Sequence, residues 1–473
     1  MSKTKKIRVS FPGYSAFQVT GSMTLIEVDD HKILIEAGLV QGASVLQDWK
    51  ANTRKLPFKP SEISYIFIGH GHADHMLLIP RLYAMGCNAT IVAPCGTADL
   101  FRIMAKDSSF IISKDAEMLS KMNGKTFVPF YTEADVINAA AHFCEYEFGE
   151  IYTLCDWLNF RFTPSGHIIN AAQIELWLSH GANTVKIGYT SDLGSGIPKR
   201  FANTFKPMEK CNLLIGESTY ARELRPITIK DRHKDVEKIK TVVDECCIKN
   251  GGRVLIPIFS LDRSQNLLSI LYDLFGKDTS FTLPVLIDSP LTIQMFNYMR
   301  TQLTGDELEY YEEMLSWPNL VWVEDYADSK RWQESDKPAV ILAASGMMQA
   351  GRSRRWAALL LPDEKSHILF CGFSVEQSLA SKIKNGRTQK TITIDGKKIK
   401  NRCGISDLHS FSGHMNRENL MKYYSDVQAD KIALVHGEFE AKAIFAKELQ
   451  NEIYKKNKTS KVICVNRSTE ILI

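Results

Sequence analysis

Three histidines and an aspartate occupy the six positions His70–His75, directly after the apolar run Ile63–Ile68. Imidazole and carboxylate groups together suit Zn²⁺ or a similar borderline cation. Four such donors are too many for one tetrahedral ion that also keeps a position open, so the pattern predicts two metal ions. The apolar run is typical of a buried strand, and helical spacing follows from about Asp74. We therefore expect the donors on a strand-to-helix turn.

Two later segments supply donors that a pair of ions would still need. His167 follows the strand-like stretch Asn159–Phe162, and Asp192 ends another strand-like stretch that begins at Ile187. A lone histidine at such a turn is more often a satisfied polar residue or a helix cap than a ligand. Packing and capping do not require three histidines within six positions, however, so the segment His70–His75 indicates a metal centre.

Size and composition describe a globular protein of about two domains. The chain has 473 residues, of which 44% are hydrophobic and 24% charged, and its formal net charge is +4. A chain of this length exceeds one ordinary hydrophobic core. Because the net charge is small, any attraction for nucleic acid would have to come from local clusters of basic residues.

The cysteines and the apolar runs indicate in which cellular compartment the protein is found. Ten cysteines are scattered without a CxxC pair. This spacing argues against a disulfide framework and against a cysteine-type zinc site, so we expect reduced thiols. The basic stretch Met1–Arg8 leads into no apolar signal core, and no apolar run reaches the length of a membrane span. We therefore expect a cytoplasmic protein without membrane contact.

The order of strand-like and helix-like segments predicts two architectures. Short strands and turns extend to Gly38, and strands alternate with helices from Ile63 to Asp192, with a lid-like helical stretch at 97–141. Two sheets with flanking helices, an αββα sandwich, fit this part. From about Cys211, repeated strand–loop–helix units predict parallel α/β architecture.

Serine residues follow three strands of this α/β part, at Ser260, Ser289 and Ser345. At a helix N-terminus, free backbone N–H groups and the helix dipole favour an anion. Each serine alone is equally well explained as a cap in a tight turn. Because the pattern repeats, we expect an edge that contacts phosphate groups, with Arg263 and Arg352 as counter-charges.

The chain becomes basic near residue 390. An Asp395-Gly396 pair, typical of a hairpin turn, is flanked by Lys390, Lys397, Lys398, Lys400 and Arg402. Most such runs are solvated faces. In a nuclease, this one is a candidate for contact with the nucleic-acid backbone.

Taken together, these features resemble the metallo-β-lactamase superfamily. Its successive motifs are similar to His70–His75, His167 and Asp192. Motifs A, B and C of its β-CASP branch, the nucleases that process RNA and DNA, are similar to segments that contain Glu217, His414 and His436. The resemblance extends over nearly the whole chain, and a histidine in motif C is typical of RNA-processing members. In build, the chain is similar to prokaryotic relatives of the cleavage-and-polyadenylation endonuclease subunit.

The resemblance implies an αββα metallo-β-lactamase domain, residues 1–212 and 395–473, with an inserted parallel α/β (β-CASP) domain, residues 213–394. It also implies two zinc ions per chain. One ion would be held by His70, His72 and His167, the other by Asp74, His75 and His436, and both by a bridging Asp192.

The same resemblance assigns catalytic roles to Asp74, Asp192, His414 and Glu217. His414 would be a general acid near the leaving oxygen and Glu217 its partner, because a neighbouring carboxylate favours imidazolium. A purely structural hydrogen bond between the two is the alternative. One residue departs from the family pattern: Glu36 stands where the superfamily usually carries an aspartate that supports the ligand histidines.

The function implied is metal-assisted hydrolysis of phosphodiester bonds in single-stranded RNA, with endonucleolytic and 5′-to-3′ exonucleolytic modes both open. Three rival functions compete with it: a hydrolase of small thioesters, lactones or lactams, a catalytically weak RNA-binding scaffold, and a DNA nuclease. The second α/β domain counts against the first, the full set of seven donors against the second, and His436 against the third. The sequence does not fix the oligomeric state, and a homodimer stays open.

Overall fold

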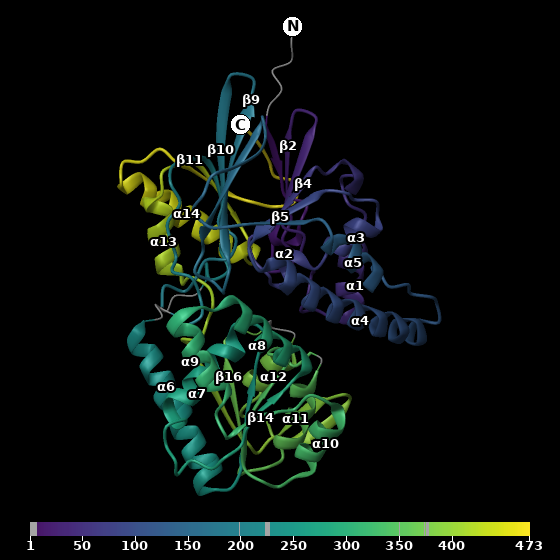
Figure 1. Ribbon diagram of the computed structural model, residues 1–473, viewed down its shortest axis with the longest axis vertical. Coiled ribbons are helices and arrows are strands. Elements are labelled where there is room, and N and C mark those ends of the chain that lie inside the picture. The colour runs from purple at the N-terminus through teal and green to yellow at the C-terminus, as the bar shows by residue number, and fades with distance from the viewer. Residues whose placement is uncertain (1–6, 198, 223–227, 350, 373, 375–377) are drawn as a thin grey trace. The chain divides into compact units, whose positions relative to one another are not determined.

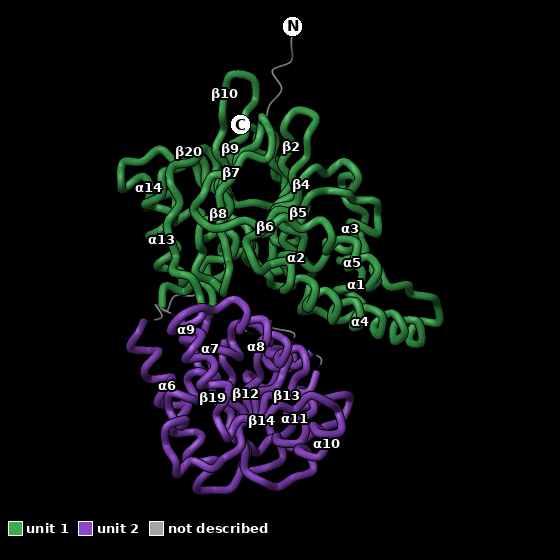
Figure 2. The backbone as a smooth tube through the Cα atoms, in the orientation of Figure 1, with its two compact units in different colours: residues 1–198, 202–226, 413–473 green, residues 199–201, 227–412 purple. Residues whose placement is uncertain are grey.

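The computed structural model describes the chain except residues 1–6, 198, 223–227, 350, 373 and 375–377. It contains two compact units, one formed by residues 1–198, 202–226 and 413–473 and the other by residues 199–201 and 227–412 (Figure 2). None of the helices within the described segments is long and apolar enough to cross a membrane.

Two mixed sheets form the first unit. The first sheet contains, in spatial order, β22 (Glu470–Leu472), β1 (Arg8–Ser10), β2 (Thr24–Val28), β3 (His31–Ile35), β4 (Tyr65–Phe67), β5 (Thr90–Pro94) and β6 (Phe143–Tyr146). The second contains β21 (Lys461–Cys464), β20 (Ala429–Val435), β11 (Cys211–Glu217), β10 (Asn183–Tyr189), β9 (Ala172–His180), β8 (Leu158–Pro164) and β7 (Tyr152–Cys155). Each sheet is antiparallel from one edge to its middle, at β3 or β10, and parallel from there to the other edge.

The core of this unit lies between the two sheets. In β8, buried Leu158 and Phe160 alternate with partly exposed residues, which is the period of a strand with one face in the core. Ile35 and Phe67 of the first sheet belong to the same buried cluster as Phe160. Helices flank both sheets, so the unit is an αββα sandwich (Figure 1). They are α1 (Val45–Thr53), α2 (Ala73–Met76), α3 (Ile79–Ala84), α4 (Thr97–Asn123), α5 (Glu133–Ala140), α13 (Arg417–Asp426) and α14 (Phe439–Lys455).

The second unit is built on a six-stranded sheet in which every neighbouring pair is parallel. Its spatial order is β14 (Leu320–Trp322), β13 (Val285–Asp288), β15 (Ala339–Ala343), β12 (Arg253–Pro257), β16 (His367–Cys371) and β19 (Gly404–Leu408). β12, β13 and β15 are buried along their whole length, as expected for parallel strands covered on both faces. The other elements are α6 (Ile229–Val243), α7 (Arg263–Phe275), α8 (Pro290–Gln302), α9 (Gly305–Leu315), α10 (Tyr326–Glu334), α11 (Arg352–Leu360), α12 (Leu379–Asn385) and the hairpin β17 (Thr391–Ile394) and β18 (Lys397–Lys400).

The compact units differ from the boundaries that the sequence suggested at residues 213 and 395. β11 pairs with β10 and β20 inside the sandwich, and β19 pairs with β16 inside the second unit. β11 is a mainly apolar run next to a parallel neighbour, and β19 is only five residues long. A run of that kind looks the same in either sheet, so composition does not tell which sheet the strand joins.

Candidate metal centre

The seven expected ligands follow the ends of four strands in the sandwich. After β4 the chain turns through His70 and His72, and the short helix α2 then carries Asp74 and His75. The remaining ligands, His167, Asp192 and His436, follow β8, β10 and β20. The expected strand-to-helix turn is therefore present, although α2 ends at Met76 and does not continue into α3.

Four of these residues form one donor group. Nε2 of His70 lies 3.0 Å from Nδ1 of His72, which lies 3.2 Å from Nε2 of His167. Oδ2 of Asp192 lies 3.5 Å from Nε2 of His70 and 3.6 Å from Nε2 of His167. In a tetrahedral zinc site with bonds of about 2.0–2.1 Å, ligand atoms lie about 3.3–3.4 Å apart. The group thus has the spacing that a tetrahedral zinc ion requires.

A second donor group adjoins the first. Nε2 of His436 lies 3.2 Å from Nε2 of His75 and 3.4 Å from Oδ2 of Asp74. Nε2 of His75 lies 3.8 Å from that Asp74 oxygen and 3.4 Å from Oδ1 of Asp192. Each carboxylate oxygen of Asp192 therefore faces a different group of histidines, which is the arrangement of a bridging ligand.

Several polar atoms of the cluster are buried without a hydrogen-bond partner: Glu36 Oε2, His75 Nδ1 and Asp192 Oδ1. These residues are at most 2% exposed. A buried polar group left unpaired costs about 1–3 kcal/mol, and more when it is charged. A cation bound among these donors would remove that cost for the Asp192 oxygen, so the residues present fit a metal.

The pKa values of the donors are shifted in different directions. Burial lowers the pKa of His72 to about 4, so its ring is neutral at pH 7, and a neutral ring is the form that binds metal. Burial alone would raise the pKa of Asp192, but the surrounding histidines, His436 first, hold it well below its usual range. Burial lowers the pKa of His75 as well, but the carboxylates of Asp192 and Glu36 outweigh burial and raise it well above its usual range, so a metal bound at this ring would displace a proton.

Hydrogen bonds from outside the donor set orient three of the rings. His70 Nδ1 lies 2.9 Å from Ser191 Oγ, His436 Nδ1 lies 2.9 Å from Thr219 Oγ1, and His167 Nδ1 lies 3.0 Å from the Gly413 carbonyl oxygen. A ring that donates through Nδ1 leaves its Nε2 lone pair for a metal. Our sequence reasoning missed Ser191, Thr219 and Gly413. The only signal for them was that each lies within two residues of Asp192, Glu217 or His414 in the chain.

Glu36 contacts the donor cluster without belonging to the seven expected ligands. Its Oε1 accepts hydrogen bonds from the Gly69 N–H and the Ser191 hydroxyl, both at 3.1 Å, and its Oε2 lies 3.4 Å from His75 Nδ1. Burial raises the pKa of the Glu36 carboxyl. The glutamate thus contacts both the ligand turn and a ligand histidine, which is the supporting position expected for it.

Backbone strain is concentrated in the same place. Glu36, Ser191 and His436 have left-handed backbone conformations, with φ of 64°, 49° and 52°. Each such residue other than glycine costs on the order of 1 kcal/mol or more and persists only where its surroundings impose it. Tight packing adds to this at Gly38, where a Cβ would lie 1.6 Å from the Asp74 carbonyl oxygen.

His414 and Glu217 lie together at the rim of the cluster. His414 Nδ1 is 3.3 Å from Glu217 Oε1 and 3.8 Å from Asp192 Oδ2. Glu217 is itself fixed, because its oxygens accept hydrogen bonds from the backbone N–H groups of Leu193 and Thr219. Burial lowers the pKa of His414, but the carboxylates of Glu217 and Asp192 outweigh burial and raise it. The His414 side chain keeps 19% exposure, against 1% for Glu217.

The three serines of the expected phosphate edge follow β12, β13 and β15, which end in register in the second unit. Ser289 caps α8 by accepting a hydrogen bond from the Thr292 N–H, and the Thr292 hydroxyl donates to Ser260 Oγ at 3.0 Å. Ser260 and Ser345 do not directly precede their helices, because α7 begins at Arg263 and α11 at Arg352. Ser289 is therefore the one serine of the three that caps a helix, while α7 begins at Arg263, where a helix was expected.

The two expected counter-charges differ. The Arg352 guanidinium donates to Asp288 Oδ1 at 2.5 Å and to the backbone carbonyls of Val323 and Glu324. These bonds give Arg352 a structural role, and its contact with phosphate stays a prediction. Arg263 lies over the Phe259 ring, with 5.0 Å from its guanidinium carbon to the ring centroid. No hydrogen bond or ion pair joins this guanidinium to another described residue, so Arg263 stays a candidate.

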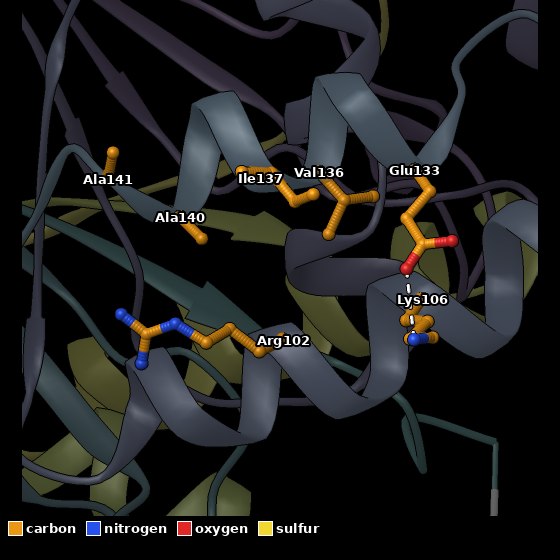
Figure 3. A pocket seen from close by; sticks show the side chains of 7 residues that line it. All are labelled: Arg102, Lys106, Glu133, Val136, Ile137, Ala140 and Ala141. Carbon is orange, nitrogen blue, oxygen red and sulfur yellow. Dashed lines mark ion pairs between the residues drawn. The ribbon is translucent and has the colours of Figure 1, made fainter.

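A separate surface cavity of about 340 Å³ lies between α4 and α5, in the stretch that the sequence suggested as a lid (Figure 3). Its lining combines apolar side chains of α5 with Arg102 and Lys106 of α4, and Lys106 is ion-paired with Glu133. None of the metal-cluster residues lines it. This cavity is therefore not the metal centre.

Comparison with known families matches three parts of the chain. The metallo-beta-lactamase superfamily matches residues 17–84, the Beta-Casp domain matches residues 264–383, and the Zn-dependent metallo-hydrolase RNA specificity domain matches residues 398–460. Together with the αββα sandwich and the histidine–aspartate cluster, these matches define a metal-dependent hydrolase. The chain belongs to the metallo-β-lactamase superfamily and, within it, to the β-CASP branch.

Individual relatives are similar over most of their length. The chain is 27% identical over 463 residues to the transcription termination factor FttA of Methanocaldococcus jannaschii, covering 95% of this chain and 70% of the relative. It is 26% identical over 438 residues to Ribonuclease TTHA0252 of Thermus thermophilus, covering 91% and 93%. A crystal structure of a protein of unknown function from Enterococcus faecalis shares the fold, with a TM-score of 0.53, 11% identity and coverage of 99% and 100%.

Proposed function

We propose that this chain is a zinc-dependent ribonuclease that hydrolyses phosphodiester bonds of single-stranded RNA at a two-metal centre. The observation that carries the proposal is the pair of donor groups that share the two oxygens of Asp192. One relative is named a ribonuclease and another a transcription termination factor. The match to the RNA specificity domain spans His414 and His436, which adds support for RNA as substrate.

The seven donors would hold two zinc ions, with Asp192 between them. When bound, zinc polarises a phosphate oxygen and lowers the pKa of an attacking water. The protein's part is to fix the donors, and Glu36, Ser191 and Thr219 do so through the hydrogen bonds described above.

His414 is the residue best arranged to protonate the departing ribose oxygen. Glu217 Oε1 lies on its Nδ1 side, where a carboxylate favours the protonated ring that a general acid needs. Partial exposure at the rim allows contact with an RNA strand. A positioned general acid contributes about 10²–10⁴-fold to such a step.

In this proposal the sandwich is the catalytic domain and the second unit, residues 199–201 and 227–412, is the β-CASP domain. Ser260, Ser289, Ser345 and Arg263, at one edge of its sheet, are proposed contacts for the phosphate groups of the RNA. Cleavage within the strand is the proposed mode, and cleavage from a 5′ end is a second mode to be tested.

The test uses the full chain loaded with zinc, together with 5′-labelled single-stranded RNA, matched single-stranded DNA, an RNA duplex and a chromogenic β-lactam. We expect cleavage of the single-stranded RNA, its loss with chelator, and internal products in end-labelled mapping. Cleavage of DNA alone or of the lactam alone would overturn the RNA assignment. Preferential cleavage of the duplex would overturn the preference for single strands.

A further inference from the structure

Positive charge is concentrated in one short segment of the second unit. Residues 382–402 contain eight of the 58 basic residues of the chain and one of its 54 acidic residues. These 21 residues thus carry a net charge of +7, whereas the other 452 residues, with 50 basic and 53 acidic side chains, carry −3. The chain's net positive charge therefore comes entirely from this segment.

The hairpin β17–β18 gives the segment a defined two-sided form. Ile392 and Ile394 of β17 are buried in the same apolar cluster as Trp356. Side chains alternate along a strand, so Thr391 and Thr393 lie on the opposite face, and both are exposed. The buried face fixes the hairpin to the unit and leaves the other face in solvent.

Lysines of β18 stand opposite these threonines. Lys400 pairs in register with Thr391, and Lys398 with Thr393. Directly opposite residues in an antiparallel pair have Cβ atoms about 4.5–5.5 Å apart and share one face. The solvent face of the hairpin therefore alternates hydroxyl and ammonium groups.

The exposed lysines of the segment are not neutralised by carboxylates of the described residues, whereas the partly buried Lys384 is ion-paired with Asp407. The only acid of the segment, Asp395, is already ion-paired with Arg354. No ion pair or hydrogen bond joins the ammonium groups of the segment's exposed lysines to another described residue; these lysines are Lys382, Lys390, Lys397, Lys398 and Lys400. Like charges held this close repel one another, so an anionic partner would stabilise the arrangement.

The chemistry of this face identifies the kind of partner. Lysine acts as a point charge toward phosphate, and threonine hydroxyls also donate to phosphate oxygens. The segment contains no aromatic residue on which a base could stack. Such a face is complementary to a sugar–phosphate backbone and reads no base sequence. β17 falls in residues 384–397, which none of the three family matches covers, whereas Lys398 and Lys400 lie at the start of the match to the RNA specificity domain.

We propose that the solvent face formed by Thr391, Thr393, Lys398 and Lys400, together with the exposed Lys390 and Lys397 that flank it, is a second RNA-binding surface, named here the lysine hairpin. It holds the phosphate backbone of a single strand through charge, independently of base sequence. The inference rests on the proposed ribonuclease function for its choice of RNA among polyanions. It adds a binding surface that lies outside the metal centre and outside the serine edge.

The test compares the wild-type chain with a variant in which Lys390, Lys397, Lys398 and Lys400 are replaced by glutamine. Binding to an unstructured RNA of about 30 nucleotides is measured as a function of salt, with His414→Ala in both proteins so that the RNA stays intact. We expect binding about tenfold weaker near 0.1 M salt. The slope of log affinity against log salt should fall by about 0.7 for each phosphate that the variant no longer neutralises. Hydrolysis of bis(p-nitrophenyl) phosphate by the zinc-loaded variant with His414 intact should not change.

A matched control replaces four exposed lysines elsewhere on the same unit, Lys240, Lys277, Lys330 and Lys337, by glutamine. It makes the same change in net charge and should keep wild-type RNA affinity. Unchanged affinity and slope in the hairpin variant, or equal losses in the control, would overturn the proposal. Tighter binding of the wild type to anionic lipid vesicles than to RNA would overturn the choice of partner. If the hairpin variant loses RNA binding but the wild type cleaves no RNA, the ribonuclease proposal fails and the surface stands.

Discussion

Asp192 of the sandwich and Asp288 of the second unit are both buried acids at strand ends, with 2% and 0% exposure, yet their surroundings are opposite. Asp288 accepts hydrogen bonds from Arg352, Ser329 and Trp356, at 2.5–2.7 Å. Asp192 has imidazoles at 3.4–3.6 Å and one oxygen without a hydrogen bond. The carboxylate of Asp288 has hydrogen-bond donors from the protein itself. The carboxylate of Asp192 is arranged for a partner that the protein does not supply.

This difference separates a structural polar cluster from a ligand-binding one. Native proteins pair nearly all their buried polar groups, so each unpaired group needs an explanation. At Asp288 every hydrogen bond stabilises the fold. At Asp192 an unpaired oxygen and a donor spacing of 3.0–3.6 Å occur together, and a bound cation would account for both.

The largest expected effect comes from removing two donors of the second group with Asp74→Ala and His75→Ala together. We expect RNA cleavage to fall by about 10⁴-fold or more, since catalytic groups that act as a unit fail together. Single-turnover rates measure the loss, and circular dichroism checks that the fold is kept. Activity that persists in a folded double variant would mean that this group does not take part in catalysis.

His414→Ala removes a side chain that contacts the cluster without belonging to either donor group. We expect cleavage about 10²–10⁴-fold slower, with the metal content of the wild type. Elemental analysis alongside the kinetics distinguishes the roles. Loss of metal from this variant would make His414 a ligand, and an unchanged rate would leave the Glu217–His414 contact a structural one.

Arg352→Ala tests whether the polar cluster around Asp288 stabilises the fold. It leaves the buried Asp288 carboxylate without its cation, and breaking a buried pair in this way costs about 3–5 kcal/mol. We expect that loss in the free energy of unfolding measured with urea, while metal content stays unchanged. Arg355→Ala, an exposed position on the same helix, is the control and should cost well under 1 kcal/mol. Normal stability with weakened RNA binding would favour Arg352 as a phosphate contact.

Lys442 is intermediate between Asp192 and Asp288, because it is a buried side chain with a hydrogen bond to a backbone carbonyl. Its Nζ donates to the Ala16 carbonyl oxygen at 2.5 Å, and burial lowers its pKa to about 8. The unfolded chain has a lysine pKa of about 10.4, so between pH 8 and 10.4 it binds more protons than the folded chain. Stability should therefore rise with pH in this window, by about 1–2 kcal/mol from pH 7 to 9.5, relative to Lys442→Met. If the free energies of unfolding of the two proteins change in parallel with pH, that result would contradict the lowered pKa of Lys442.

The sequence predicted the parts of this molecule that are local. The strand, turn and helix around His70–His75 follow from an apolar run next to clustered donors, and the parallel strands of the second unit follow from their apolar runs. The αββα sandwich was also expected. Assigning His167, Asp192 and His436 to the same centre depended on the family resemblance, because nothing local links them.

Long-range contacts could not be predicted. Glu36 and Ser191 are 155 residues apart and meet only because β3 and β10 lie in facing sheets. Arg352 could have been a free cation or the partner of Asp288, and only side-chain packing decides between these. The helix expected from Arg263 begins there, whereas Ser345 was expected near a helix N-terminus and α11 begins only at Arg352, because serine is common both at helix caps and in the loops before them.

Counting the zinc bound per chain tests the dinuclear centre most directly. Elemental analysis after exhaustive dialysis should give two zinc ions for the wild-type chain. Asp192→Asn keeps the shape of the side chain but offers one ligand oxygen, so about one ion should remain. One ion or none in an active wild-type chain, or two ions still bound to Asp192→Asn, would contradict a centre built on a shared carboxylate.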